Sequence, residues 1–474
     1  MNRFRCFHCC VCLVLFAASL PTTSVAQGTL ASNRDLMRRI AEGVANVIQK
    51  NFYDPSLKGI DWKKTLADTK EKINQCNSVG EMNAAIHRMV QKVDDSRTNF
   101  VPPSLTMEPR FGFDAKAYGE TVLVYRVKKG GPAAKAGLLA GDAILAVDGV
   151  VADRKHYPLA QYYYRFIQPA GVMILDYVRD GSRNRVTIQA EVQTHAAITY
   201  AYEFYRAVDW AREEQTVESE NRFAHASDDG VGYVKIAEFT SGGDLSRIEP
   251  SFPGVTAHFT GVEEVMGKVK GSRALVVDLR GNPGGAFDVL ESFASKFDQD
   301  QTSFTFGLNP ARGSPDVLER FVGYFDRDPT EIAEEIDRDT RHKIFSKPHH
   351  PSYSDIPIAV LVDSESANNS EVVARHLQRT GRAVIIGDKT AGHVSVARQF
   401  MQKIGADPAV FYGVQTTVAQ VLFPDGKGLE ITGVTPDIMC IPTAADLAAG
   451  KDPCLALAMN TLKAKLGKGA GTQN

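Results

Sequence analysis

The stretch VLVDSESANNSEVVARHLQRTGRAVIIGDKTAGH, residues 360–393, predicts a buried strand, a short polar turn and a helix that begins within Asn-Asn-Ser-Glu. Many hydrolases hold a nucleophile where a strand enters a helix through such a turn, because exposed amides and the helix dipole favour an oxyanion there. The stretch ends in a second apolar strand, AVIIGD. Further apolar strands, GVGYVKIAEF and ALVVDL, alternate with helical patterns across residues 196–465. This order predicts an α/β core whose sheet is covered on both faces.

Two segments of different character precede this core. Residues 27–105 are helical in pattern, with a capping box at Ser78 and Glu81 and one apolar face formed by Leu36, Ile40, Val44 and Ile48. Residues 106–195 change to short alternating strands broken by glycine-rich turns. Within the core, the long charged segment 309–355 contains a helical pattern that predicts either a lid or a solvated surface insertion. The sequence therefore predicts a multi-domain α/β protein.

Composition narrows the classes of partner. The chain has 474 residues, 43% hydrophobic and 23% charged, with a formal net charge of -2. A near-neutral chain without a polybasic run has no electrostatic footprint for nucleic acid or for an anionic membrane surface. Neither partner is expected.

The first residues predict export. Residues 1–26 carry two arginines, a short apolar run and the small residues Ser24 and Ala26 at the spacing of a signal-peptidase site. Cleavage after Ala26 leaves a periplasmic or secreted chain with no membrane span; an uncleaved anchor is the alternative, although the run is short for one. At the other end, the Gly/Lys-rich residues 466–474 predict a disordered tail.

Three cysteines, Cys76, Cys440 and Cys454, remain after signal cleavage. They lack the paired spacing of a zinc site, and nothing else in the sequence indicates a metal or an organic cofactor. Cys440 and Cys454 either form a disulfide in an oxidising compartment or stay as two buried thiols. The sequence leaves both possibilities open.

The string GGPAAKAGLLAGDAILAVDG, residues 130–149, resembles the PDZ domain of secreted proteases. This resemblance makes residues 106–195 a PDZ domain and makes Phe111, Gly112 and Phe113 its carboxylate-binding loop. A PDZ domain binds an extended chain end by strand addition, with loop amides on the terminal carboxylate. The expected partners are polypeptide C-termini or unstructured protein segments.

Several strings together resemble the tail-specific, C-terminal-processing serine peptidases: DSRTNFVPP, the PDZ string, VVDLRGNPGG, VLVDSESANNSE, RAVIIGDKTAG and LFPDGKGLEITGVTPD, in that order. The resemblance covers nearly all of the mature chain and implies a crotonase-like α/β core. It also implies an oxyanion hole made by the amides of Gly284 and Gly285 in the glycine-rich turn and of Asn369 at the helix start.

The resemblance fails at the residues that carry the chemistry. In most relatives the turn has a serine nucleophile where this chain has Asn368, and a carboxamide has no hydroxyl to deprotonate. One branch of the family takes its base from a lysine, whose place is held here by His393. The branch that this chain resembles more uses a histidine as its general base, and Arg97 stands at that position here. Arginine stays protonated at any working pH and cannot act as a base.

Two hypotheses remain. The first is a secreted pseudo-protease that binds extended polypeptides or C-termini without cleaving them. The second is an active serine-type endopeptidase with a displaced nucleophile, Ser366 or Ser370, served by His393. The first is favoured, because displacement around a helix start moves the oxygen by several ångströms and about 1 Å already costs roughly a hundredfold in rate.

Overall fold

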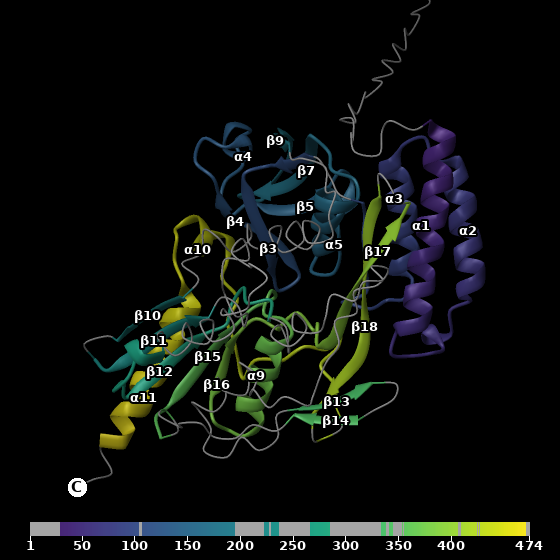
Figure 1. Ribbon diagram of the computed structural model, residues 1–474. Coiled ribbons are helices and arrows are strands. Elements are labelled where there is room, and N and C mark those ends of the chain that lie inside the picture. Colours follow the sequence, from purple (N-terminus) through teal and green to yellow (C-terminus); the bar gives the residue numbers. More distant parts are fainter. Residues whose placement is uncertain are drawn as a thin grey trace, which may run out of the picture.

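The computed structural model describes most of the chain outside its first 28 residues and four longer internal gaps (Figure 1). The predicted signal segment 1–26 and the last four residues therefore lie outside the described part. The described residues are 29–103, 107–194, 222–226, 229–236, 266–284, 333–337, 341–344, 353, 355–405, 409–423, 425 and 427–470.

Three helices open the described chain: α1 Leu30–Asn51, α2 Trp62–Gln75 and α3 Val79–Gln91, with the 3-10 helix η1 Leu57–Gly59 between the first two. Each helix begins after a residue whose side-chain oxygen accepts an N–H of the first turn, as helix starts require; these caps are Thr29, Asp61 and Ser78. The predicted apolar face of α1 is confirmed, since Ile40, Val44 and Ile48 are fully buried.

The helices share their core with a distant hairpin. The strands β17 Ser395–Ile404 and β18 Val410–Leu422 pair antiparallel and run along the helices (Figure 1). The short strand β1 Asn99–Val101 joins β18 with Phe100 opposite Val414, and both side chains are fully buried within the same core as the helices. Segments predicted to belong to different domains therefore form one hydrophobic core.

The PDZ region is an antiparallel sheet with two helices. Its strand order is β3-β4-β5-β7-β8, with β6 paired to β5, and β3 is an edge strand as far as the described residues show. A separate pair, β2 Met107–Arg110 with β9 Glu191–Thr194, closes the region. The remaining bounds are β3 Phe113–Tyr118, β4 Thr121–Val127, α4 Pro132–Lys135, β5 Ala143–Val147, β6 Val150–Val151, α5 His156–Tyr162, the π-helical turn η2 Tyr163–Ile167, β7 Val172–Arg179 and β8 Ser182–Gln189.

The central sheet has the order β10-β11-β12-β15-β16-β19 and is parallel from β11 to β19. Alternate residues face opposite sides: Val277 packs toward α9 Asn369–Arg379, and Val276 packs toward α11 Pro453–Ala470. The predicted α/β sheet covered on both faces is therefore confirmed. Its strands are β10 Arg222–Ala226, β11 Val231–Ile236, β12 Ala274–Asp278, β15 Ile358–Val362, β16 Val384–Gly387 and β19 Ile438–Met439.

Two expectations about local structure need correction. Within the charged segment, β13 Ala333–Asp337 and β14 Arg341–Ile344 form a hairpin that pairs with β18, where the sequence pattern was helical. Helix α11 continues to Ala470, through the first residues of the predicted disordered tail 466–474, because its apolar side packs on the sheet.

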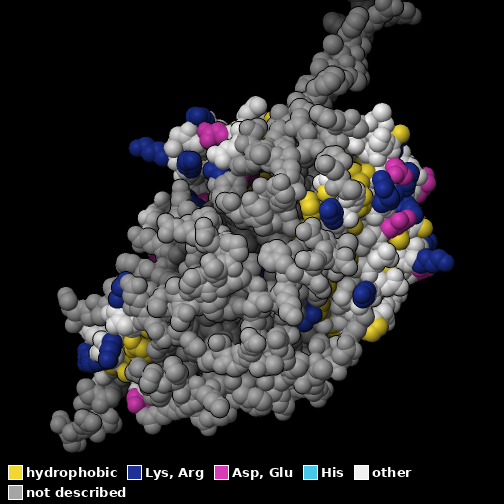
Figure 2. All heavy atoms as spheres, viewed as in Figure 1, with side chains coloured by type: hydrophobic (Ala, Val, Ile, Leu, Met, Phe, Trp, Pro, Cys, Tyr) yellow, Lys and Arg dark blue, Asp and Glu magenta, His cyan; other side chains and the backbone are white. Residues whose placement is uncertain are grey.

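The described surface carries charges of both signs, and the sulfur atoms of the three described cysteines are all accounted for. Basic and acidic side chains lie next to one another over the helical segment in Figure 2. None of the helices in the described part combines the length and apolarity needed to cross a membrane. Cys440 and Cys454 form a disulfide, which resolves the open alternative, and Cys76 is a buried free thiol.

Phe100 tests the shared core. The Phe100→Ala change should lower the free energy of unfolding by about 3–5 kcal/mol, because it empties a buried site between the helices and β18. Val101→Ala, at the partly exposed neighbour, should cost less than about 1.5 kcal/mol. Chemical unfolding of both variants measures the difference, and equal small losses would contradict a shared core.

Candidate active site

The turn after β15 is built around one buried carboxylate. Asp363 accepts main-chain N–H groups from Gly281 at 2.9 Å and from Glu365 and Ser366 at 3.0 Å. Its other oxygen lies 2.6 Å from Lys116 Nζ of β3. Burial tends to raise the pKa of Asp363, but the lysine and these donors outweigh it and hold the pKa below its ordinary value. This carboxylate therefore shapes the turn that leads to α9.

Asn368 stands at the start of α9 in a strained backbone conformation. Its φ of 52° and ψ of -117° lie outside the regions that L-residues favour. A nucleophile on a sharp strand-to-helix turn is held in strain of this kind, because the turn exposes the side chain above the helix N-terminus. The side chain present is nevertheless a carboxamide that is almost fully buried.

Ser366 and Ser370, the two displaced candidates, have structural roles. The Ser366 hydroxyl donates to the carbonyl of Leu279 at 2.8 Å, and the Ser370 hydroxyl donates to the carbonyl of Asn282 at 3.0 Å. Both side chains are fully buried. Each hydroxyl ties the start of α9 to the glycine-rich turn and points its proton at a main-chain acceptor.

Glu371 joins the helix start to the loop after β16. One of its oxygens accepts the N–H of Asn368 at 3.0 Å and of His393 at 2.9 Å. The other accepts from Thr390 Oγ1 at 2.5 Å and from the N–H of Gly392 at 2.7 Å. Complete burial raises the pKa of Glu371 to about 7, although these donors favour the charged form. The main-chain N–H groups of Asn368, at the predicted nucleophile position, and of His393, at the position of the family's lysine base, thus donate to the same Glu371 oxygen.

His393 and Arg97 are electrostatic neighbours. Burial and, after it, the Arg97 charge lower the pKa of the His393 imidazole to about 4, while Asp95 acts in the opposite direction. The imidazole is therefore neutral at pH 7 and a weak base. The structure thus brings Arg97, His393 and Asn368 into one region; their predicted catalytic roles remain predictions.

Glu430 belongs to the same cluster. Its Oε1 lies 3.4 Å from the N–H of Ser96, and burial raises its pKa, with Asp95 adding to the effect. Asp95 itself accepts hydroxyls of Thr98 at 2.7 Å and Thr417 at 2.6 Å. The sequence contained Glu430 in a family motif but gave it no role. The signal that could have found it is a carboxylate between Leu429 and Ile431, two apolar neighbours within the motif.

The glycine-rich turn packs directly on Asn368. A β-carbon on Gly284, which has φ 96°, would lie 2.6 Å from Asn368 Cβ and 2.9 Å from Asn369 N, so only glycine fits. The Gly284 N–H donates to Asn282 Oδ1 at 2.8 Å, so this amide is occupied rather than free for an oxyanion. Asn369 is fully buried, and its carboxamide has no hydrogen-bond partner among the described residues. Gly285 lies outside them.

The PDZ region is fastened to both loops of the site. Besides the Lys116–Asp363 pair, Arg154 bonds Asp388 Oδ2 at 3.0 Å and the carbonyl of Thr390 at 3.2 Å. Asp388 also accepts the N–H of Gly119 at 2.8 Å. These side chains are mostly buried, so removing one partner of either ion pair would leave a buried charge unpaired and destabilise the fold.

The predicted carboxylate-binding loop borders the edge strand β3. Gly112 has φ 76°, and the carbonyls of Phe111 and Gly112 accept main-chain N–H groups from Ala133 and Lys128, both at 2.9 Å. Phe113 begins β3, beside helix α5. The loop is thus a tight turn at the end of β3, which pairs with no strand on its outer side among the described residues, although Ser364 donates to the carbonyl of Ala117 there.

Comparisons with known proteins agree with this fold. Family models match residues 230–440 as peptidase family S41 and residues 123–172 as a PDZ domain. The chain is 26% identical over 419 residues to the chloroplastic C-terminal processing peptidase of Tetradesmus obliquus, covering 83% of this chain and 75% of that protein. It is 27% identical over 317 residues to a carboxy-terminal-processing protease of Bartonella bacilliformis, covering 65% of this chain and 56% of that protein.

Among solved structures, mature CPAF complexed with lactacystin has a TM-score of 0.59 at 15% identity, covering 88% of this chain and 96% of that one. At this identity the likeness concerns the fold. Taken with the family matches, the chain carries a region similar to peptidase family S41 after a region similar to a PDZ domain, and the similar proteins named above are C-terminal-processing proteases.

The raised pKa of Glu371 predicts that the free energy of unfolding depends on pH. Its pKa rises from 4.5 to about 7 on folding, so its contribution to stability is full below pH 4.5 and is lost as the pH rises through 7. The shift corresponds to about 3 kcal/mol. Glu371→Gln should remove this slope, because a carboxamide does not titrate, whereas Glu120→Gln at an exposed turn should keep it. The free energy of unfolding of the native protein and of both variants is to be measured at pH 5 and pH 8. The same change between the two pH values in all three proteins would contradict the prediction.

Proposed function

We propose that this chain is an exported pseudo-protease that binds extended polypeptides or chain ends and does not cleave them. The observation that carries the proposal is Asn368, which occupies the strained start of α9 with a side chain that cannot form an acyl-enzyme. The binding part of the proposal is supported by the PDZ-like region and its edge strand β3.

The hydroxyls nearest Asn368 do not favour the alternative of an active endopeptidase. Ser366 and Ser370 are buried and donate to the carbonyls of Leu279 and Asn282. To attack a substrate, either hydroxyl would have to give up a bond that holds the turn and then reach the surface. A nucleophile must also lie within hydrogen-bond reach of a base. Neither hydroxyl has a hydrogen bond to His393 in the described part of the chain.

Export is part of the proposal. It is supported by the signal-like residues 1–26 and by the Cys440–Cys454 disulfide, because disulfides persist mainly in oxidising compartments. Periplasm and extracellular space both meet this condition.

A serine-directed fluorophosphonate probe tests the absence of a nucleophile. The purified mature protein should remain unlabelled and should not hydrolyse unstructured polypeptides. Stoichiometric labelling mapped to Ser366, Ser370 or the buried Ser96 of the Arg97 cluster would overturn the proposal and support an active peptidase.

Introducing a serine at position 368 and a histidine at position 97 tests whether these are the family's nucleophile and base positions. The double change Asn368→Ser with Arg97→His should produce weak peptidase activity, and neither single change should, because a hydroxyl without a base stays protonated. Glu430 lies beside Arg97 and would orient the new imidazole, since its Oε2 has no hydrogen-bond partner among the described residues. Cleavage is to be measured on an unstructured polypeptide and abolished by a serine-directed inhibitor. Equal activity in the unmodified protein would refute the assignment.

Peptide amidation tests the PDZ loop. The full-length protein should bind a peptide with a free apolar C-terminus more tightly than the amidated peptide by about 1–3 kcal/mol, the scale of a lost charge-assisted hydrogen bond. Gly112→Val should remove the difference, because valine does not tolerate the positive φ of that turn. Calorimetry measures both, and equal affinity of acid and amide for the native protein would show that the loop does not read a carboxylate.

A further inference from the structure

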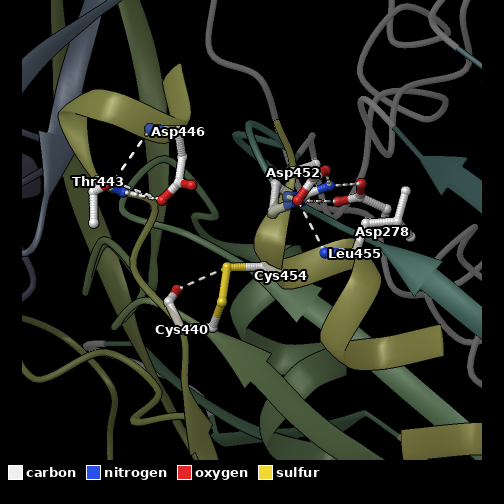
Figure 3. Close-up of a disulfide and its surroundings, with 8 residues drawn as sticks. Asp278, Cys440, Thr443, Asp446, Asp452, Cys454 and Leu455 are labelled. Atoms are coloured by element: carbon white, nitrogen blue, oxygen red, sulfur yellow. Dashed lines mark hydrogen bonds and ion pairs between the residues drawn. A yellow bond between two sulfur atoms is a disulfide. The ribbon is translucent and has the colours of Figure 1, made fainter. Parts of the chain in front are cut away.

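The Cys440–Cys454 disulfide closes a loop that reaches two parts of the molecule at once. Cys440 follows β19, and Cys454 lies in the first turn of α11, with the two Cα atoms 5.6 Å apart. Between them the chain forms the short helix α10 Ala444–Ala448. Figure 3 shows the disulfide, with the cap of α10 on one side and Asp452 on the other.

The tip of the loop contacts the PDZ region. A β-carbon on Gly141, which has φ 94°, would lie 2.7 Å from the carbonyl oxygen of Ala444 and 3.1 Å from Ala448 Cβ. At a second PDZ turn, Gly119 approaches Ile441 to 3.5 Å by the same measure. Main chain of the PDZ region therefore packs directly on α10, at a distance that only glycine permits.

The base of the loop holds the residue before the glycine-rich turn. Asp452 makes a two-bond ion pair with Arg280, with distances of 2.9 Å and 2.8 Å. It also accepts the N–H of Leu455 at 2.9 Å and so caps α11. Arg280 bonds Asp278 as well, through Nε at 2.9 Å and Nη2 at 2.6 Å. Planar two-bond pairs of this kind fix orientation as well as distance.

Arg280 needs both carboxylates. Asp278 is 1% exposed and also accepts the Tyr233 hydroxyl at 2.9 Å, so it holds one side of the guanidinium from within the sheet. Asp452 holds the other side from the loop, where its side chain is 38% exposed. Without the disulfide, Asp452 would keep its bonds to Arg280 and to the N–H of Leu455, but the chain between β19 and α11 would no longer be closed covalently beside it.

We propose that the disulfide-closed loop 440–454 is a strut that holds the PDZ region with its tip and positions the turn Gly281–Gly284 with its base. Asp452 is the positioning residue for that turn and acts through Arg280. The inference goes beyond the proposed function and does not depend on whether the protein cleaves or only binds polypeptides. Two-electron reduction of the disulfide by a dithiol, which is itself oxidised to a disulfide, releases both ends of the strut.

Amide hydrogen exchange of the full-length chain tests the strut. In the variant Cys440→Ser with Cys454→Ser, amides of residues 279–284 and 139–142 should exchange at least about tenfold faster than in the oxidised protein. A dithiol should produce the same change in the native protein and none in the variant, since Cys76 is not paired. Unchanged exchange at 279–284, with faster exchange confined to residues 441–453, would overturn the proposal.

A second pair of variants separates positioning from helix capping and stays informative if the cysteine variant does not fold. Asp452→Asn keeps a cap acceptor for α11 but loses the charge that Arg280 binds, so exchange should rise at 279–284 and stay unchanged at 455–458. Asp452→Glu, which keeps a carboxylate, should retain protection. Asp446→Asn is the matched control, because Asp446 caps α10 with Thr443 and lies away from Asp452 in Figure 3. Exchange at 279–284 within twofold of native in Asp452→Asn would overturn the role of Asp452.

Discussion

The glycine-rich turn and the turn before α9, which lie on either side of Asn368, are tied together by the buried carboxylate of Asp363. Three main-chain N–H groups converge on it, from Gly281 in the glycine-rich turn and from Glu365 and Ser366 in the turn before α9. These turns follow neighbouring parallel strands, so one acceptor between them sets their separation. Lys116 supplies the countercharge from the PDZ region. A buried carboxylate without it would be costly, which makes the PDZ region part of the site's electrostatic balance rather than an appended module.

Glu371 fixes the second half of the site in the same way. It holds Asn368 and His393 through their main-chain N–H groups, so the identity of neither side chain matters for the bonds that place them. Arg154 and Asp388 then fasten the loop after β16 to the PDZ region. Both loops that carry the expected catalytic positions are therefore held by buried charges from outside the loops.

Local features of the fold were predictable from the sequence. The Ser78 helix cap, the apolar face of α1 and the buried parallel strands depend on residues close together in the chain, and each is confirmed. Contacts between distant residues were not predictable: Lys116 and Asp363 are 247 positions apart, and no periodicity links them. The β13–β14 hairpin was missed because its pairing with β18 overrides a charged, helix-like pattern. The contacts of Glu371 with the loop after β16 also depend on the fold, because Thr390, Gly392 and His393 lie 19 to 22 positions away.

The backbone geometry around Asn368 is held by contacts that do not involve a hydroxyl at this position. The strained turn is maintained by the Ser366 and Ser370 hydroxyls, by Glu371 and by the close approach of Gly284, none of which requires a hydroxyl at position 368. The φ of 52° and ψ of -117° at Asn368 lie outside the left-handed region that asparagine tolerates, so the surrounding contacts must hold the strain. Burial of its side chain favours a residue whose polar atoms are uncharged at every pH. The scaffold of a hydrolase turn can therefore persist under selection for binding alone, because the forces that shape it act on the main chain and not on the reacting group.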